Sequence, residues 1–303
     1  MYDIIIPTAS KDVGFIHLVF EYIRKNLKEA DIIYVITNRS CFNKIQKYDL
    51  KHFNVILLDE NELIQSLSFE RIQKILLSQD VHIRVGWYFQ QFLKMAFALT
   101  KYSKDYYLTW DSDTLPLNHI SFFDDKERPL FTMKAEFNQP YFDTLQKLLG
   151  FGKLAPFSFI AEHMMFNSNI MKELINRIET NNSKGSDWVE KILFACTDLQ
   201  EPCFSEFETY GSYVWKFHPN MYGVQKLNTF RSAGIIKGRH IDSYCLERMA
   251  LDLDTASFEL FDKPPFQYRF DYYAHIWRQR FRQLKGRSIR STYNLILNWL
   301  RRN

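Results

Sequence analysis

The sequence predicts an α/β fold, with a mostly parallel β-sheet flanked by helices. The first reason is that short apolar, strand-like runs alternate with amphipathic helical spacings over the first third of the chain, the pattern of a doubly wound sheet. The second is that another apolar run, residues 106–110, ends at Asp111-Ser112-Asp113, and open α/β sheets bind ligands at the carboxyl ends of their strands. With 303 residues, 46% of them hydrophobic, the chain is long enough to bury such a sheet.

Three strands are expected before the acidic pair, each a short run rich in Ile, Val and Leu. They span residues 2–7, 31–37 and 53–58. Segments with a helical spacing of apolar residues cover 14–27, 62–80 and 84–99. The strand ends carry Pro7 with Thr8, then Asn38, then Asp59. We expect these residues to hold the base and ribose of a nucleotide, although loop solvation and helix capping explain each of them equally well.

After the acidic pair, the chain is expected to continue with short strands and helices. A strand is expected at residues 129–133, and a strand pair at 155–166. Helices are expected at residues 141–150, 167–180 and 205–217. Asn167 or Ser168 would cap the second of these helices, because such a side chain accepts a backbone N–H of the first turn.

Asp111 and Asp113 form the main candidate site. Side chains two residues apart in an extended backbone point the same way, so the two carboxylates would converge and repel each other unless a cation lies between them. A hard divalent cation such as Mn²⁺ or Mg²⁺ suits two carboxylates and would carry a phosphate-bearing substrate. His240 is the preferred further metal ligand, with His218 as the alternative. The competing interpretation is an Asp-rich turn that only caps and solvates a strand end.

Gln91 and Lys94 are polar residues on an otherwise apolar helical segment. They lie about one helical turn apart, and burying either side chain without a partner would be costly. We expect Lys94 to hold a substrate phosphate, and we assign Gln91, Arg84 and Ser112 to the same donor site. The alternative is a lysine whose stem crosses apolar surface to reach water.

Two further carboxylates, Glu206 and Glu208, begin the helix expected after Ser205. Ser205 and Glu208 have the spacing of a capping box, which explains Glu208 without any chemistry. Glu206 has no such explanation and is the preferred general base toward an acceptor hydroxyl, with Glu208 as the second choice. Glu162 and His163 are candidates for contacting the acceptor, although a core histidine is as reasonable an interpretation of His163.

The last part of the chain differs in charge. After position 267, nine Lys or Arg residues accompany one acid, a local net charge of +8; because the whole chain carries +4, residues 1–267 carry −4. Aromatic and aliphatic residues interleave with these cations at near-helical spacing, which predicts a basic amphipathic helix over 268–303 that binds an anionic membrane surface. Packing on its own domain or on a second subunit is the alternative. Nucleic acid is disfavoured as a partner because the rest of the chain is acidic.

Cysteine usage and the chain start predict a cytoplasmic protein. The four cysteines are dispersed, with no C-x-x-C pair, which suits reduced thiols and disfavours zinc. No apolar segment reaches the roughly 18 to 20 residues that a membrane span needs. Residues 1–4 run directly into a strand without a basic leader. The basic tail would then hold the protein at the inner face of the cytoplasmic membrane.

Several short motifs resemble the GT-A-fold glycosyltransferases, and among them an uncharacterised bacterial family often associated with capsule or lipopolysaccharide genes. The motifs are Trp87 to Lys94, the Tyr-Leu-Thr-Trp-Asp-Ser-Asp-Thr run that ends at Thr114, Phe122-Phe123-Asp124, and Ser205 to Gly211. The likeness covers roughly residues 2–240. It implies a GT-A-like catalytic domain, which we expect over 1–267, with a nucleotide-sugar-binding half (1–118) and an acceptor-binding half (119–267). The tail at 268–303 lies outside the likeness and is expected from composition alone.

The resemblance implies a transferase of the hexosyltransferase type. The donor would be a nucleotide-diphosphate sugar, with UDP-sugars favoured, held through Mn²⁺ or Mg²⁺ on Asp111 and Asp113, and the acceptor a saccharide or glycolipid. The Glu-Asp pair of many inverting relatives is missing, and Glu206-Phe207-Glu208 stands instead, so the stereochemistry stays open.

Two alternatives remain. Haloacid-dehalogenase-type phosphohydrolases also carry D-x-D after a strand, but near the N-terminus and with Thr or Val four residues after the first Asp, where this chain has Leu115. The other alternative is a non-catalytic protein that binds a sugar nucleotide or a membrane and keeps the fold without the chemistry.

Overall fold

The computed structural model describes residues 1–270, 273–274 and 276–277. The basic helix predicted over 268–303 therefore lies almost wholly outside the described residues, and its binding to a membrane stays a prediction. Within the described ranges, no helix is both long enough and apolar enough to cross a bilayer.

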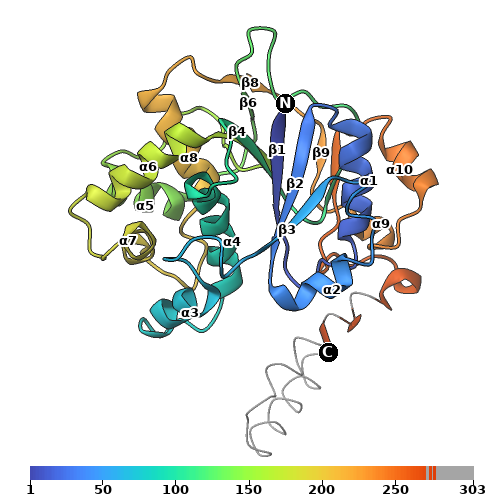
Figure 1. Cartoon of the computed structure of the whole chain (residues 1–303), viewed down its shortest axis with the longest axis horizontal. Helices are drawn as coiled ribbons and strands as arrows, with labels where there is room; N and C mark the ends of the chain where they lie inside the picture. The colour runs from blue at the N-terminus through green and yellow to red at the C-terminus, as the bar shows by residue number, and fades with distance from the viewer. Residues whose placement is uncertain (271–272, 275, 278–303) are drawn as a thin grey trace, which may run out of the picture.

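A five-stranded sheet forms the centre of the molecule and confirms the predicted α/β class (Figure 1). The strand order is β3-β2-β1-β4-β7. The first four strands are parallel to their neighbours, and β7 runs antiparallel to β4. The strands are β1 (Tyr2–Pro7), β2 (Ala30–Thr37), β3 (Val55–Asp59), β4 (Tyr106–Trp110) and β7 (His163–Asn167). The carboxyl ends of β1 to β4 consequently meet along one edge of the sheet.

Both faces of the sheet are covered, which is why its central strands are mostly apolar; the buried acid of β1, Asp3, pairs with Lys104. All six residues of β1 are buried. Ile4 and Ile6 pack into one hydrophobic core with α1 (Ile16–Asn26), whereas Ile5 packs into the other with α4 (Val85–Ala96). Alternate side chains of a strand point to opposite faces, so one strand serves two cores.

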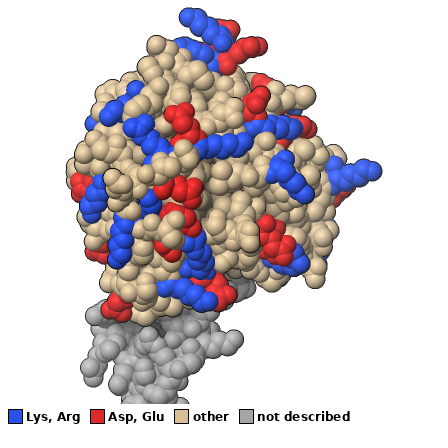
Figure 2. Space-filling view, turned by 60° about the vertical axis from the view of Figure 1, so that its left-hand side comes forward, with Lys and Arg blue, Asp and Glu red and all other residues tan. Residues whose placement is uncertain are grey.

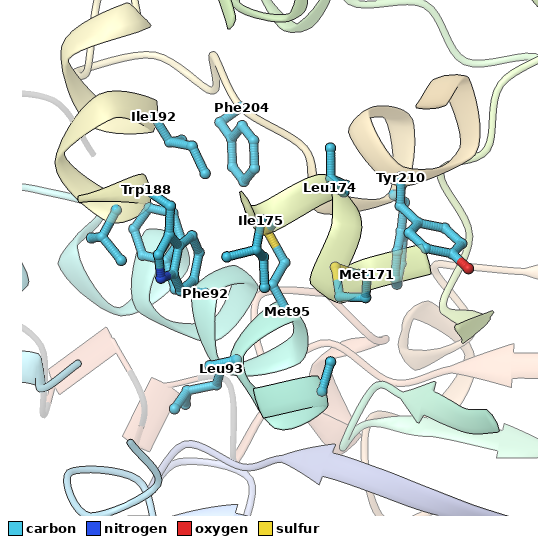
Figure 3. Packing of buried hydrophobic residues seen from close by; sticks show 14 of the residues in the cluster. Phe92, Leu93, Met95, Met171, Leu174, Ile175, Trp188, Ile192, Phe204 and Tyr210 are labelled. Carbon is cyan, nitrogen blue, oxygen red and sulfur yellow. The ribbon is translucent and has the colours of Figure 1, made fainter. Parts of the chain in front are cut away.

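The larger core lies between the sheet and a layer of helices on the α4 side (Figure 1). Besides α4, these helices are α3 (Phe69–Leu77), α5 (Gln139–Leu149), α6 (Ser168–Thr180), α7 (Trp188–Ala195) and α8 (Glu206–Phe217). Figure 3 shows Phe92 of α4 facing Trp188 of α7, and the two rings meet edge to face at a centroid distance of 5.6 Å. Interlocked rings of this kind hold α4 firmly among its neighbours.

Short elements complete the fold. One small sheet contains β5 (Thr114–Pro116), β10 (Thr255–Ser257) and β9 (Thr229–Phe230), and another contains β6 (Leu130–Thr132) and β8 (Gly223–Gln225). The short α-helices are α2 (Phe42–Ile45), α9 (Gly234–Lys237) and α10 (Ser243–Met249). Single turns of 3₁₀ helix are η1 (Arg39–Cys41), η2 (Phe97–Leu99) and η3 (Phe266–Tyr268).

Two predicted elements differ from the structure. The helix expected at 62–80 begins only after Ser68, whose hydroxyl accepts the Arg71 N–H and caps α3. The strand pair expected at 155–166 reduces to β7, because the preceding residues are irregular apart from one bridge between Ser158 and Lys134. There the chain turns to seat Phe159 on α8, so close to Gly211 that a Cβ at that glycine would clash with the ring.

Candidate active site

Asp111 and Asp113 lie where β4 ends, at the predicted edge of the sheet. The backbone between them is a turn and not extended, because the Thr114 N–H donates to the Asp111 carbonyl over 3.2 Å. The predicted extended backbone is therefore wrong for this stretch. Both carboxylates nevertheless line one cavity of about 480 Å³, together with Ser112.

This cavity, which we name the acidic cavity, has more acids than bases on its wall. The acids are Asp12, Asp111, Asp113, Glu136, Glu206 and Glu259, and the bases are Lys11, Arg84, Lys94 and Arg231. Several of them form ion pairs, such as Arg231 with Glu136, and acidic and basic side chains also alternate over the face of the molecule drawn in Figure 2. The excess of carboxylates makes the cavity suited to a cation.

Lys94 is a buried cation that contacts two carboxylates of the acidic cavity. Its ammonium lies 3.0 Å from an oxygen of Asp111 and 3.0 Å from an oxygen of Glu206, while its side chain is only 6% exposed. Burial disfavours the ammonium, but the two carboxylates outweigh that effect and raise the pKa of Lys94. The same side chain lies over the Phe207 ring, 4.4 Å from its centroid. Lys94 is thus a counter-ion to both carboxylates, and the alternative of a lysine reaching water is wrong. Its contact with a substrate phosphate stays a prediction.

Arg239 is the corresponding cation beside Asp113, and nothing in its sequence position predicted this. Its guanidinium pairs with Asp12 at 2.6 Å and lies 3.7 Å from Asp113. It also donates to the backbone carbonyls of Phe258 and Lys11, so it holds the loop after β1 and the loop after β10 together. Burial, then Asp12 and Asp111, raise the pKa of Asp113 to about 7 against the opposing effect of Arg239. Negative charge at Asp113 is therefore only partly compensated by the protein.

The carboxylate pair offers the oxygen atoms that a hard divalent cation prefers. Across the described ranges, no group of three or more His, Cys, Asp or Glu side chains has the arrangement of a metal site. Mg²⁺ and Mn²⁺ need no such group when a phosphate-bearing substrate supplies the other oxygens, because one or two carboxylates then suffice. Asp111 and Asp113 are the residues that would hold the ion. The predicted third ligand, His240, is exposed and does not belong to the described lining of the acidic cavity, and His218 pairs with Glu173 at 3.0 Å.

A second cavity, which we name the strand-end cavity, adjoins the acidic cavity. It has a volume of about 600 Å³ and shares Pro7, Ala9 and Gln90 with its neighbour. Its charged wall residues are Glu60 and Glu70, and no Lys or Arg occurs among its described lining residues. Such a wall suits an uncharged ring better than a phosphate.

Of the strand-end residues predicted from the sequence, some line the strand-end cavity and one caps a loop. Pro7, Thr8 and Asn38 line the strand-end cavity as expected. The Asn38 amide has a fixed orientation, because its oxygen accepts from Ser40 and its nitrogen donates to Glu60 over 3.2 Å. Glu60, which the sequence analysis missed, is thereby held at the wall. Asp59 is not in the described lining; its carboxylate pairs with Arg39 at 3.0 Å and accepts the Asn61 N–H, which is the loop-capping alternative.

The two glutamates of α8 lie in different surroundings. The Ser205 hydroxyl accepts the Glu208 N–H over 3.2 Å, as predicted, but the Glu208 carboxylate accepts from Ser158 and from the Phe159 N–H, so the reciprocal half of the capping box does not form. Burial raises the pKa of Glu208. Glu206 lines the acidic cavity, and its backbone N–H donates to Gln91. Of the two, only Glu206 belongs to the described lining.

Glu162 and His163 lie behind the acidic cavity and not on its described wall. Glu162 is buried between Lys134 and Arg231, each at 3.3 Å. His163 is buried, stacks on Trp110 with ring centroids 5.0 Å apart, and shares a hydrogen bond with the Thr132 hydroxyl. The structure therefore favours the core-histidine interpretation, and Glu162 orients Arg231 from behind.

Because His163 is buried and neutral, acid is expected to destabilise the fold through it. Burial and the nearby Lys134 lower the pKa of His163 from 6.5 to about 3. The unfolded chain takes up this proton near pH 6.5, so the stability that His163 contributes is present above that pH and is lost as the pH falls toward 3, by about 1.4 kcal/mol per pH unit.

Urea denaturation at a series of pH values measures this slope. His163→Phe is expected to remove the part of the slope due to this residue, whereas His52→Gln, at an exposed histidine, is expected to leave it unchanged. Identical slopes for wild type and His163→Phe would show that the imidazole is not excluded from water.

Fold and site together define an α/β protein with an acidic cavity at the carboxyl edge of a mostly parallel sheet. The chain belongs to a family of unknown function, DUF6492, whose model matches residues 2–245. A search of curated proteins found no match to this chain.

Solved structures with a similar chain path include two glycosyltransferases. A galactosyltransferase, LgtC, in complex with donor and acceptor sugar analogs, has 11% sequence identity and a TM-score of 0.46, covering 89% of this chain and 93% of the other. Mouse xyloside xylosyltransferase 1, in its apo form, has 9% identity and a TM-score of 0.42, covering 87% of this chain and 99% of the other.

Proposed function

We propose that this protein is a metal-dependent glycosyltransferase that uses a nucleotide-diphosphate sugar. The observation that carries the proposal is the pair Asp111 and Asp113, which end a central strand inside a cavity with an excess of acids. A site for a cation together with a phosphate-bearing ligand accounts for both features. Haloacid-dehalogenase chemistry has no comparable support, since Leu115 stands where that chemistry uses Thr or Val.

The two adjoining cavities suggest how the donor lies. The strand-end cavity, with no Lys or Arg in its described lining, would take the base, and uridine is favoured by the family resemblance. The diphosphate would lie beside Asp111 and Asp113, where Lys11 and Arg84 supply positive charge. The sugar would then face Glu206 and Tyr141, on the wall of the same cavity. A saccharide or lipid-linked acceptor of surface polysaccharide synthesis would enter from that side.

The chain's own residues supply positioning and a proton acceptor. A bound divalent cation would neutralise charge on the leaving diphosphate. In an inverting reaction, Glu206 accepts the proton of the acceptor hydroxyl, and Lys94 together with Gln91 holds Glu206 in place through its carboxylate and its backbone N–H.

A thermal-shift screen with nucleotide sugars, with and without Mn²⁺, tests the proposal. The right donor at about 100 times its Kd should add about 2.7 kcal/mol of stability, which raises the Tm by several degrees, and only when Mn²⁺ is present. No shift with any nucleotide sugar would refute the proposal. A shift without sugar transfer or donor hydrolysis would instead support the non-catalytic alternative.

A further inference from the structure

A group of exposed apolar side chains lies around α9 and the segment that follows β10. Ile235 is 46% exposed, Phe261 58% and Phe266 81%, with Ile236 and Phe270 also exposed. Large apolar side chains gathered at this exposure mark a surface that meets a partner.

The segment after β10 packs along α9, so these side chains come from adjoining parts of the fold. A Cβ at Gly234 would lie 2.5 Å from an Asp262 oxygen, and a Cβ at Gly238 would lie 3.5 Å from Pro264. The Lys237 ammonium lies over the Tyr268 ring, 5.8 Å from its centroid. We name this surface, made by Ile235, Ile236, Phe261, Phe266 and Phe270, the apolar ridge.

The apolar ridge reaches the acidic cavity. Phe261 lines that cavity, and the Lys11 ammonium, also on the cavity wall, lies 5.7 Å from the Phe261 ring centroid. Any partner on the apolar ridge therefore lies at the edge of the site that contains Asp111 and Asp113.

We propose that the apolar ridge docks on an anionic lipid bilayer. The chain that continues from the ridge, after position 267, carries nine Lys or Arg residues and one acid. Exposed aromatic rings followed by basic residues match the interface of a membrane, where rings enter the headgroup layer and cations meet anionic lipids. A second copy of the chain would carry the same excess of cations after position 267, and like charges repel each other.

Docking in this way brings the membrane to the edge of the acidic cavity. If the protein is the glycosyltransferase proposed above, its acceptor is a lipid-linked saccharide whose reactive hydroxyl stands in the headgroup layer. This last step rests on the proposed function, whereas binding of the apolar ridge to lipid does not.

Sedimentation of the full chain with vesicles tests the proposal without any nucleotide. Wild type is expected to pellet with vesicles of phosphatidylcholine and phosphatidylserine and to stay in solution with phosphatidylcholine alone. The double variant Ile235→Ser/Phe266→Ser is expected to bind about tenfold more weakly, because two inserted apolar side chains are lost. The matched control Phe137→Ser, at a side chain 62% exposed before α5, should bind as wild type does.

Unchanged pelleting of the double variant would overturn the apolar ridge as the docking site. Self-association of wild type without vesicles, lost in the double variant, would show that a second copy occupies the surface and would equally overturn the lipid proposal. If circular dichroism shows that the double variant does not fold, Ile236→Ser replaces it as a milder change at the same surface. A positive vesicle result with a negative nucleotide-sugar screen would separate this inference from the proposed function.

Discussion

Asp113→Asn is expected to abolish the Mn²⁺-dependent binding of nucleoside diphosphate while the protein stays folded. The substitution keeps the shape of the side chain but removes one of two carboxylates available to the ion, and loss of a ligand should weaken metal-dependent binding by about 100-fold or more. Folding should not suffer, because Asp113 already stands close to Asp12 and Asp111, and its charge is repelled by theirs. Isothermal titration with UDP, in the presence and absence of Mn²⁺, measures the effect.

The control for this experiment is Asp125→Asn, at an exposed acid in the loop before β6. It changes the net charge equally and should leave UDP binding intact. A Mn²⁺-dependent titration of Asp113→Asn that equals wild type would remove the carboxylate pair from the site and, with it, the basis of the proposed function. Unfolding of the variant, seen by circular dichroism, would show that Asp113 supports the loop structure through Arg239.

The central sheet was predictable because a buried strand has a recognisable sequence pattern, a short run of apolar residues. A strand covered on both faces, such as β1, is apolar at nearly every position, and no short amphipathic helix has that pattern. The exception in β1 is Asp3, which pairs with Lys104. Asp111 and Asp113 were recognisable for the same reason, since two acids directly after such a run stand out. The strand pair expected at 155–166 gave only β7, because the residues before it turn to seat Phe159 on α8 instead of extending a second strand.

The partners within the site were not predictable, because they join residues far apart in the chain. Lys94 attracted notice as a polar residue in an apolar helix, yet nothing local indicates that Asp111 and Glu206 both reach it. Arg239 next to Asp113 left no sequence signal at all. For Glu208, a local signal was misleading. Its spacing from Ser205 predicted a complete capping box, but its carboxylate accepts from Ser158 and Phe159 instead.

Lys94→Met is expected to destabilise the fold by about 3 to 5 kcal/mol, because it leaves the buried Glu206 and the partly exposed Asp111 without their shared cation. The Glu206 side chain is 5% exposed and gains no compensating contact with water. Methionine fills a similar volume, so the loss reports on charge and not on a cavity. Guanidinium denaturation measures the free energy of unfolding. The matched control, Lys74→Met, removes a lysine from the exposed pair with Glu70 and should change stability little.

A second substitution separates unpaired charge from lost packing. In Lys94→Met/Glu206→Gln, one of the two carboxylates left without a cation is neutral. The double variant should therefore regain a large part of the free energy of unfolding that Lys94→Met loses. Equal instability of the two variants would show that Lys94 acts through its packing on Phe207. The double variant is expected to recover stability without recovering sugar transfer. It lacks Lys94, which holds Glu206, the proposed base, beside Asp111, which would hold the metal.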